Sequence, residues 1–202
     1  EYATTIIADG PVGYWRLGAA TGEVVADSSG NALDGTYSGV VKRGAPSVLP
    51  FSADGSMGFI ANNRAYAVLP VEARVDTFPM SIEMWVQTDT NKPLEPFASR
   101  KYLYVQFANG VSTEQLYLAL AGDSATDQFV ILDTVGTGNV SQSWSVDLND
   151  GAPHHVVLTI DAGVNPSLIV DGAYAPIRAA AFGGVVAFTE ANPYIGGGSF
   201  AP

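Results

Sequence analysis

Apolar and polar residues alternate along most of this chain with a period of two, as expected for strands with one buried face. In VSQSWSVDL (residues 140–148), a mainly apolar face alternates with a face of serines and one aspartate. In HHVVLTID (residues 154–161), Val156, Leu158 and Ile160 share one face. No stretch keeps a helical period beyond two turns, so the pattern predicts an all-β protein.

Further strands are expected in TTIIAD, GYWRLG, GTYSGVV, SMGFIA, AYAVLP, SIEMWVQ, KYLYVQF, QLYLALA and FVILDTV. In SLIVDGAY, Asp171-Gly172 between two β-prone stretches predicts a tight hairpin. Residues 71–78, after Pro70, favour one short helical turn. The number and spacing of the strands predict two antiparallel sheets packed face to face, in a single domain spanning residues 1–202.

The composition limits the classes of partner. With 202 residues and 47% apolar residues, the chain can form one sizeable core. It has 9 basic and 20 acidic residues, a net charge of -11, and no basic patch longer than Lys42-Arg43 or Arg100-Lys101, which argues against a nucleic-acid partner. No apolar run approaches the ~18 residues of a membrane-spanning helix, so no membrane insertion is expected. The absence of cysteine excludes disulfides and thiolate metal sites.

Several motifs occur in a distinctive order: ADGPVGYWRLG (residues 8–18), ADSSGNALDGTY (residues 26–37), then SIEMWV, DGAPHHVVLTID, SLIVDG and YIGGG. Together they resemble the laminin-G-like, concanavalin A-like jelly-roll domains over nearly the whole chain. The resemblance implies a jelly-roll β-sandwich. The GPVGYWRLG version is similar to segments of tailed-bacteriophage virion proteins and large secreted bacterial proteins, which implies a location on a virion, outside the cell or at the cell surface.

The sequence departs from that family pattern in two places. Pro153 stands where the family often has a tryptophan before the histidine pair. After NPYIGGGSFAP (residues 192–202), the family normally has a last strand that returns beside the N-terminal strand. We therefore expect either that the chain is part of a longer polypeptide that carries the closing strand, or that another chain covers the open edge.

No enzymatic machinery is apparent in the sequence. Glycoside hydrolysis needs two carboxylates beside the scissile bond, and catalytic relatives on this fold carry acids at alternate positions of one strand. The matching strand here carries only Glu83, flanked two positions away by Ser81 and Trp85. The adjacent His154 and His155 point to opposite faces of a strand and cannot share a metal. We expect His154 at the core margin and His155 hydrogen-bonded at the surface.

Calcium is the one cofactor that the sequence suggests. In DSSGNALDG (residues 27–35), Asp27, Asn31 and Asp34 offer oxygen ligands from a loop punctuated by glycine. The alternative is an Asx-type turn, in which Asp27 and Asn31 bond to their own backbone. The sequence leaves both open.

A ligand platform is expected on residues 101–107, KYLYVQF. Leu103, Val105 and Phe107 form the expected core face, which would leave Tyr102, Tyr104 and Gln106 exposed for binding. These could stack on a sugar, contact a neighbouring subunit or form ordinary cross-strand pairs. The tryptophans, by contrast, are expected in the core: Trp15, Trp85 and Trp144.

Three functions fit these features. The first is a non-catalytic display or adhesion module of a bacteriophage virion, associated with its tail or capsid, which binds a cell-surface glycan or another protein during host attachment. The second is a structural decoration domain that assembles with other virion subunits in an oligomer or larger assembly. The third is a carbohydrate-binding accessory domain of a secreted bacterial enzyme.

Overall fold

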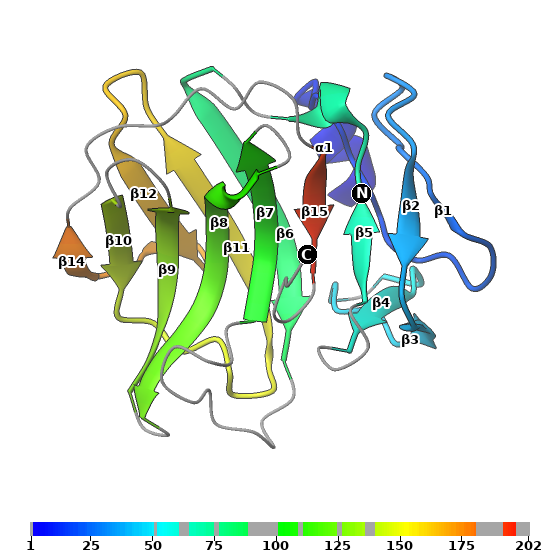
Figure 1. Ribbon diagram of the computed structural model, residues 1–202. Helices are drawn as coiled ribbons and strands as arrows, with labels where there is room; N and C mark the ends of the chain where they lie inside the picture. Colours follow the sequence, from blue (N-terminus) through cyan, green and yellow to red (C-terminus); the bar gives the residue numbers. More distant parts are fainter. Residues whose placement is uncertain are drawn as a thin grey trace.

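Two antiparallel β-sheets pack face to face in the computed structural model, which describes residues 2–50, 52–60, 65–74, 77–88, 101–108, 111–124, 127–135, 140–180 and 192–196 (Figure 1). Among these residues, the larger sheet has nine strands in the order β1-β2-β5-β15-β7-β8-β9-β10-β14, and the smaller has four in the order β13-β12-β11-β6. A separate pair, β3 and β4, lies beside β2 and β5 (Figure 1). The predicted antiparallel β-sandwich is confirmed.

The strands have the following bounds. Those of the larger sheet are β1 (Val24–Val25), β2 (Gly35–Ser38), β5 (Tyr66–Val68), β7 (Lys101–Ala108), β8 (Val111–Ser124), β9 (Asp127–Val135), β10 (Val140–Trp144), β14 (Ile177–Ala180) and β15 (Pro193–Ile195). Those of the smaller sheet are β6 (Met80–Gln87), β11 (Pro153–Ile160), β12 (Pro166–Val170) and β13 (Ala173–Tyr174). The separate pair is β3 (Val41–Ala45) and β4 (Ser56–Phe59).

The main core fills the space between the two sheets. Its members from the larger sheet include Leu116, Leu118, Leu120, Val130, Leu132 and Trp144. Those from the smaller sheet are Val156, Leu158, Ile160, Leu168 and Val170. The period-two pattern of residues 154–161 therefore places its apolar face as predicted, because alternate strand residues point to one side of a sheet.

The middle of the larger sheet is buried on both faces. A second apolar cluster consists of Val105, Tyr117, Ala119, Ala121, Phe129 and Ile131. Tyr104 belongs to the main core between the sheets and Val105 belongs to this second cluster, so both faces of β7 are covered there. Tyr104 is 6% exposed and Gln106 is fully buried, and the Tyr104 hydroxyl donates a hydrogen bond of 2.8 Å to Gln106 Oε1.

The exposure expected for Tyr104 and Gln106 is therefore wrong. Alternation showed which residues share a face, but it could not show that both faces of this central strand are covered. Tyr102, the third residue of the expected platform, has its side chain outside the described part of the chain.

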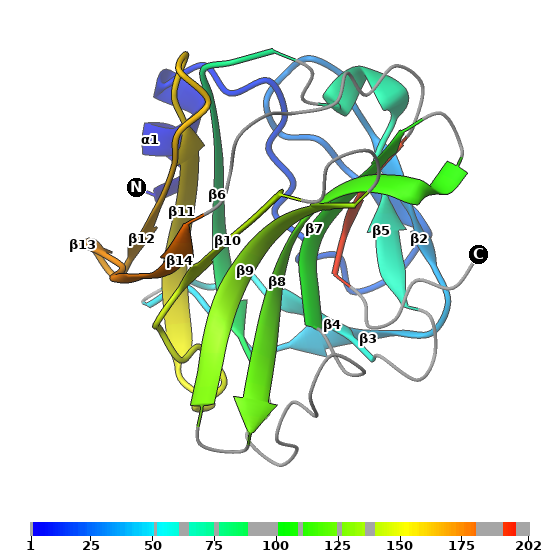
Figure 2. The same ribbon diagram turned by 60° about the vertical axis from the view of Figure 1, so that its left-hand side comes forward.

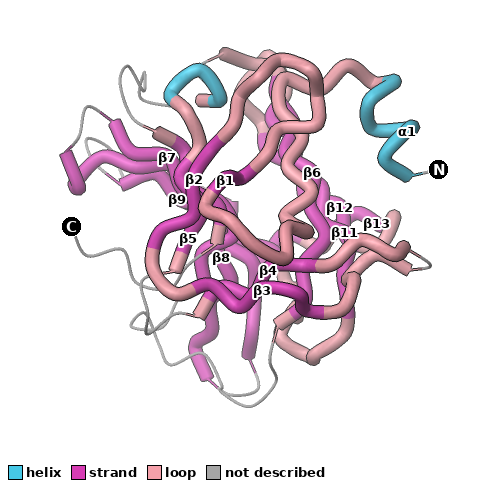
Figure 3. Tube along the Cα trace, turned by 90° about the vertical axis from the view of Figure 1, so that its right-hand side faces the viewer, coloured by secondary structure: helices cyan, strands magenta, loops and turns pink. Residues whose placement is uncertain are grey.

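The start of the chain is helical rather than extended. Residues 4–9, TTIIAD, were expected to form a strand, yet Tyr2–Ala8 forms the helix α1. The β-branched run favours a strand, but a strand needs a partner, and α1 lies outside both sheets. It lies against the outer side of the smaller sheet, away from the larger one (Figures 2 and 3). The GYWRLG stretch makes only an isolated bridge, between Trp15 and Asp27.

Two local predictions are confirmed. The turn after Pro70 is the short 3-10 helix η2 (Val71–Ala73). The hairpin between β12 and β13 turns at Asp171 and Gly172, with φ values of 51° and 82°. Positive φ at both positions matches the twist of the flanking strands, which explains the Asp-Gly pair. In the described part of the chain, no helix has the length and apolar character to cross a membrane.

Leu158 gives a direct test of the core. It is fully buried between the sheets, so Leu158→Ala should leave a cavity and lower the free energy of unfolding by about 2–5 kcal/mol in urea denaturation. The matched control is Thr159→Ala, on the opposite face of the same strand, which should cost less than about 1 kcal/mol. Equal losses would contradict the assignment of faces.

Candidate functional site

The outer face of the smaller sheet carries the chemically active side chains. On β6, the residues that pack against the core are Met80, Ile82, Met84 and Val86. The intervening residues Ser81, Glu83, Trp85 and Gln87 therefore point outward. The expectation that Trp85 lies in the core is wrong. Its separation of two residues from Glu83 was the sequence signal for this position, because residues two apart in a strand share a face.

The other two tryptophans lie where the sequence predicts. Trp144 is 1% exposed in the main core. Trp15 packs against a third apolar cluster formed by β1, β2 and β5 and the turn after them, and its Nε1 donates a hydrogen bond of 2.8 Å to the Leu33 carbonyl.

Four side chains on this face form what we call the outer-face cluster: Tyr2, Glu83, Trp85 and His155. His155 lies directly opposite Trp85 in the register of β11 and β6. Their rings stack with centroids 5.0 Å apart and planes 25° apart. His155 Nε2 lies 2.8 Å from Glu83 Oε1. The expected surface hydrogen bond of His155 is thus confirmed.

Helix α1 contributes the fourth member of the cluster. The Tyr2 hydroxyl donates a hydrogen bond of 2.6 Å to Glu83 Oε1, the same oxygen that His155 approaches. The Tyr2 ring meets Trp85 edge-on, with centroids 6.4 Å apart and planes 83° apart. Partial burial raises the pKa of Tyr2 well above its ordinary value, and the neighbouring Glu83 carboxylate raises it further. Tyr2 therefore remains a hydroxyl donor at physiological pH.

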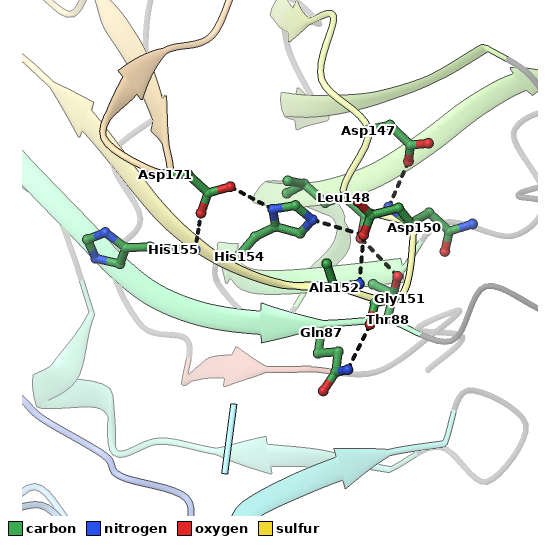
Figure 4. Close-up of polar contacts among 11 residues, drawn as sticks. Gln87, Thr88, Asp147, Leu148, Asp150, Gly151, Ala152, His154, His155 and Asp171 are labelled. Carbon is green, nitrogen blue, oxygen red and sulfur yellow. Dashed lines mark hydrogen bonds and ion pairs between the residues drawn. The ribbon is translucent and has the colours of Figure 1, made fainter. Parts of the chain in front are cut away.

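His154, on the other face of β11, is held between two carboxylates in a group that we call the His154 clamp: Asp150, His154 and Asp171 (Figure 4). His154 Nδ1 lies 2.8 Å from Asp171 Oδ2, and its Nε2 lies 3.0 Å from Asp150 Oδ1. Asp171 also accepts the His155 backbone N–H at 2.9 Å, and Asp150 accepts the Ala152 N–H at 2.7 Å. The clamp joins the β12–β13 turn to the loop that precedes β11.

The three ionisable groups of the clamp stabilise one another's charged forms. Partial burial alone would lower the pKa of His154, but its hydrogen bonds to Asp171 and Asp150 raise it above the ordinary value. The pKa of Asp150 is lowered, first by the Ala152 N–H and then by His154. For Asp171, burial would raise the pKa, but the hydrogen bonds from His154 and the His155 backbone outweigh it. The two carboxylates therefore favour the imidazolium form of His154 more than water does.

This arrangement fits a structural role better than a catalytic one. A glycosidase pair needs open space between its two carboxylates for the sugar, whereas the His154 ring occupies the space between Asp150 and Asp171. Both ring nitrogens point at carboxylates, so neither is free to act as a metal ligand. In the part of the chain that the structure describes, no group of three or more His, Cys, Asp or Glu side chains is arranged to hold a metal ion.

The loop predicted to bind calcium is closed by its own hydrogen bonds. The Asp27 carboxylate accepts the backbone N–H groups of Tyr14, Ser29 and Leu33, and also the Ser29 hydroxyl. Burial alone would raise the pKa of Asp27, but these hydrogen bonds lower it overall. The carboxylate fastens residues 27–33 to the chain near Tyr14.

The other two predicted ligands face different partners. Asp34 Oδ1 accepts the backbone N–H of Asp27 at 2.8 Å. The Asn31 side-chain amide donates to the carbonyls of Pro11 and Val12 at 3.2 and 2.9 Å. Asp27, whose carboxylate accepts the Ser29 N–H two residues on, matches the turn alternative, whereas Asn31 bonds to the backbone of Pro11 and Val12 rather than to its own. Calcium binding stays a prediction.

No protein-family model and no curated protein matches this chain. Among solved structures, it is similar to the LG4-5 domains of the mouse laminin alpha1 chain, with a TM-score of 0.46 and 20% identity over 64% of this chain. The match spans 31% of the laminin chain. The class of protein, an antiparallel β-sandwich, rests on the strand pairing described above.

The His154 clamp predicts a pH-dependent stability. Because the folded pKa of His154 lies above its ordinary value of 6.5, its stabilising contribution is present below that pH and is lost as pH rises through the folded value. Urea denaturation from pH 5 to pH 9 should show this loss in the wild type, and His154→Gln should flatten it. An identical pH profile in the two proteins would contradict the clamp.

The loop at Asp27 gives a second prediction. Asp27→Ala leaves three backbone N–H groups without their acceptor, so it should cost about 1–3 kcal/mol in EDTA and in calcium alike. Asp27→Asn keeps one acceptor oxygen and should cost less. Thermal unfolding of both variants with EDTA or with calcium chloride measures this. A loss that appears only in calcium would instead establish the calcium site.

Proposed function

We propose that this domain is a non-catalytic display or adhesion module of an extracellular particle, namely a tailed-bacteriophage virion, and that it binds a cell-surface glycan. The observation that carries this proposal is the outer-face cluster. Stacked aromatic rings beside a carboxylate combine an apolar surface for the faces of a sugar ring with hydrogen bonds for its hydroxyls. The virion assignment is supported by the resemblance of GPVGYWRLG and the motifs that follow it.

The binding role is favoured over catalysis by how the described acids are used. Asp27, Asp150 and Asp171 each accept backbone hydrogen bonds that fix a loop or a turn. Glu83 is bonded by Tyr2 and approached by His155. A carboxylate that serves as nucleophile or general base needs an open approach for substrate, and Asp27, Asp150 and Asp171 are instead held by the backbone of the fold.

The net charge narrows the class of glycan. With a net charge of -11, the protein repels polyanions over several ångströms at moderate ionic strength. A neutral or amino sugar therefore fits better than a sulfated or acidic polysaccharide.

A second function, structural decoration within the virion, is favoured by a different surface. Tyr174 on β13 is 77% exposed, and Ile177 on β14 is 61% exposed. The two residues lie close in the sequence on neighbouring edge strands of the two sheets. An exposed apolar edge suits contact with another subunit. A carbohydrate-binding accessory domain of a secreted enzyme would use the same outer-face cluster as the adhesion module.

Cell binding tests the proposal. The fluorescently labelled domain should bind host bacteria, and periodate oxidation of the surface glycans should abolish binding while protease treatment leaves it intact. Tyr174→Ser should bind as well as the wild type. Loss of binding after protease alone would point to a protein receptor. Absence of binding to any cells, together with oligomers that Tyr174→Ser disrupts, would favour the decoration role.

A further inference from the structure

We propose that the position on the outer face now occupied by the Tyr2 ring is a sugar subsite. Helix α1, which carries Tyr2, closes this subsite when no ligand is bound. The inference rests on the proposed glycan binding, and it names where the sugar sits and what keeps the subsite closed. The geometry of three side chains supports it: Glu83, Trp85 and His155.

The cluster offers more hydrogen-bonding capacity than Tyr2 uses. The indole Nε1 of Trp85 is buried and has no hydrogen-bond partner in the described part of the chain. Both hydrogen-bonded neighbours of Glu83 approach Oε1. Because an unsatisfied buried donor destabilises the folded chain, the cluster is better matched to a ligand with several hydroxyls than to a phenol with one.

Tyr2 already shows the shape and chemistry that the subsite accepts. It presents a six-membered ring against Trp85 and donates one hydroxyl to Glu83. Trp85 acts against the rise in the pKa of the Tyr2 hydroxyl, yet its N–H does not meet the geometry of a hydrogen bond. A pyranose ring in this place could donate one hydroxyl to Glu83 and present another to Trp85 Nε1, while its C–H face contacts an aromatic ring.

Helix α1 is suited to leave the subsite at little cost. It has seven residues, none of which is buried, and it has no acidic residue in its first turn and no basic residue in its last. Four consecutive β-branched residues, Thr4 to Ile7, weaken its helical preference. Helices of this length are marginal without tertiary support. If Tyr2 filled the subsite about 90% of the time, the apparent affinity for sugar would fall about tenfold.

The test uses the whole 202-residue chain and the Trp85 indole signal in ¹⁵N–¹H spectra, which Trp85→Phe assigns by its disappearance. The probes are methyl α-glucoside, methyl β-galactoside and N-acetylglucosamine, each titrated to about 50 mM, a range that covers millimolar affinity. The titrated proteins are the wild type, Tyr2→Ala, and Tyr2→Phe, the matched control that keeps the ring and loses its bond to Glu83.

In Tyr2→Ala, at least one sugar should shift the Trp85 signal saturably and bind about tenfold more tightly than in the wild type, with Tyr2→Phe between them. Adding Glu83→Gln to Tyr2→Ala should weaken that binding again. Equal affinity in wild type and Tyr2→Ala would overturn the inference, because the sugar and Tyr2 would then not compete.

A folded Tyr2→Ala whose Trp85 signal no sugar moves would also overturn it. If Tyr2→Ala failed to fold, the comparison of Tyr2→Phe with the wild type would decide in the same way. Periodate-sensitive cell binding that persists in Trp85→Phe would leave the proposed function standing and place its site elsewhere.

Discussion

The apolar contact between the two sheets is the constraint on which the rest of this structure depends. Every second residue of β11 enters it, and the neighbouring residues are thereby turned outward. A shift of one residue in this register would exchange the two faces. The core would then receive Thr159 and the outer-face cluster would lose His155, so the packing of Leu158 fixes the position of the candidate site.

The adjacent histidines of β11 take part in two different groups of side chains, one on each face of the strand. His154 points to the inner side, where Asp150 and Asp171 hold it and join two loops at the end of the sheet. His155 points to the outer side, where it stacks on Trp85 beside Glu83. Asp171 links the two groups, because one of its oxygens faces the His154 ring and the other accepts the His155 backbone N–H. The β12–β13 turn therefore supports both groups, and its Asp-Gly geometry contributes to the site as well as to the hairpin.

The hydrogen bonds of the carboxylates also support the proposed binding function over catalysis. Carboxylates that close a loop, a turn or a clamp lower the free energy of the folded state because they stay ionised and hydrogen-bonded. The same bonds leave them little freedom to exchange protons with a substrate. The outer-face cluster, by contrast, is aromatic. It is covered by α1, a short helix with no buried residue. Such a surface is suited to recognise a ligand by shape and hydroxyl pattern.

Short-range sequence patterns were enough to predict four features: the antiparallel sandwich, the apolar face of β11, the hairpin at Asp171-Gly172 and the short turn after Pro70. Each depends on alternation or on the backbone preference of one or two residues. The spacing of Glu83 and Trp85 also placed both on one face, although the apolar character of Trp85 suggested a place in the core.

Tertiary structure alone decided the other features. The burial of Tyr104 follows from its place in the main core, while Val105 fills the second cluster on the other face of β7. The helical state of α1 was not predicted by its β-branched run. The hydrogen bond between Tyr2 and Glu83, which lie 81 residues apart, could not be predicted from the sequence. Residues so distant in sequence meet only when the sheets and the helix have packed.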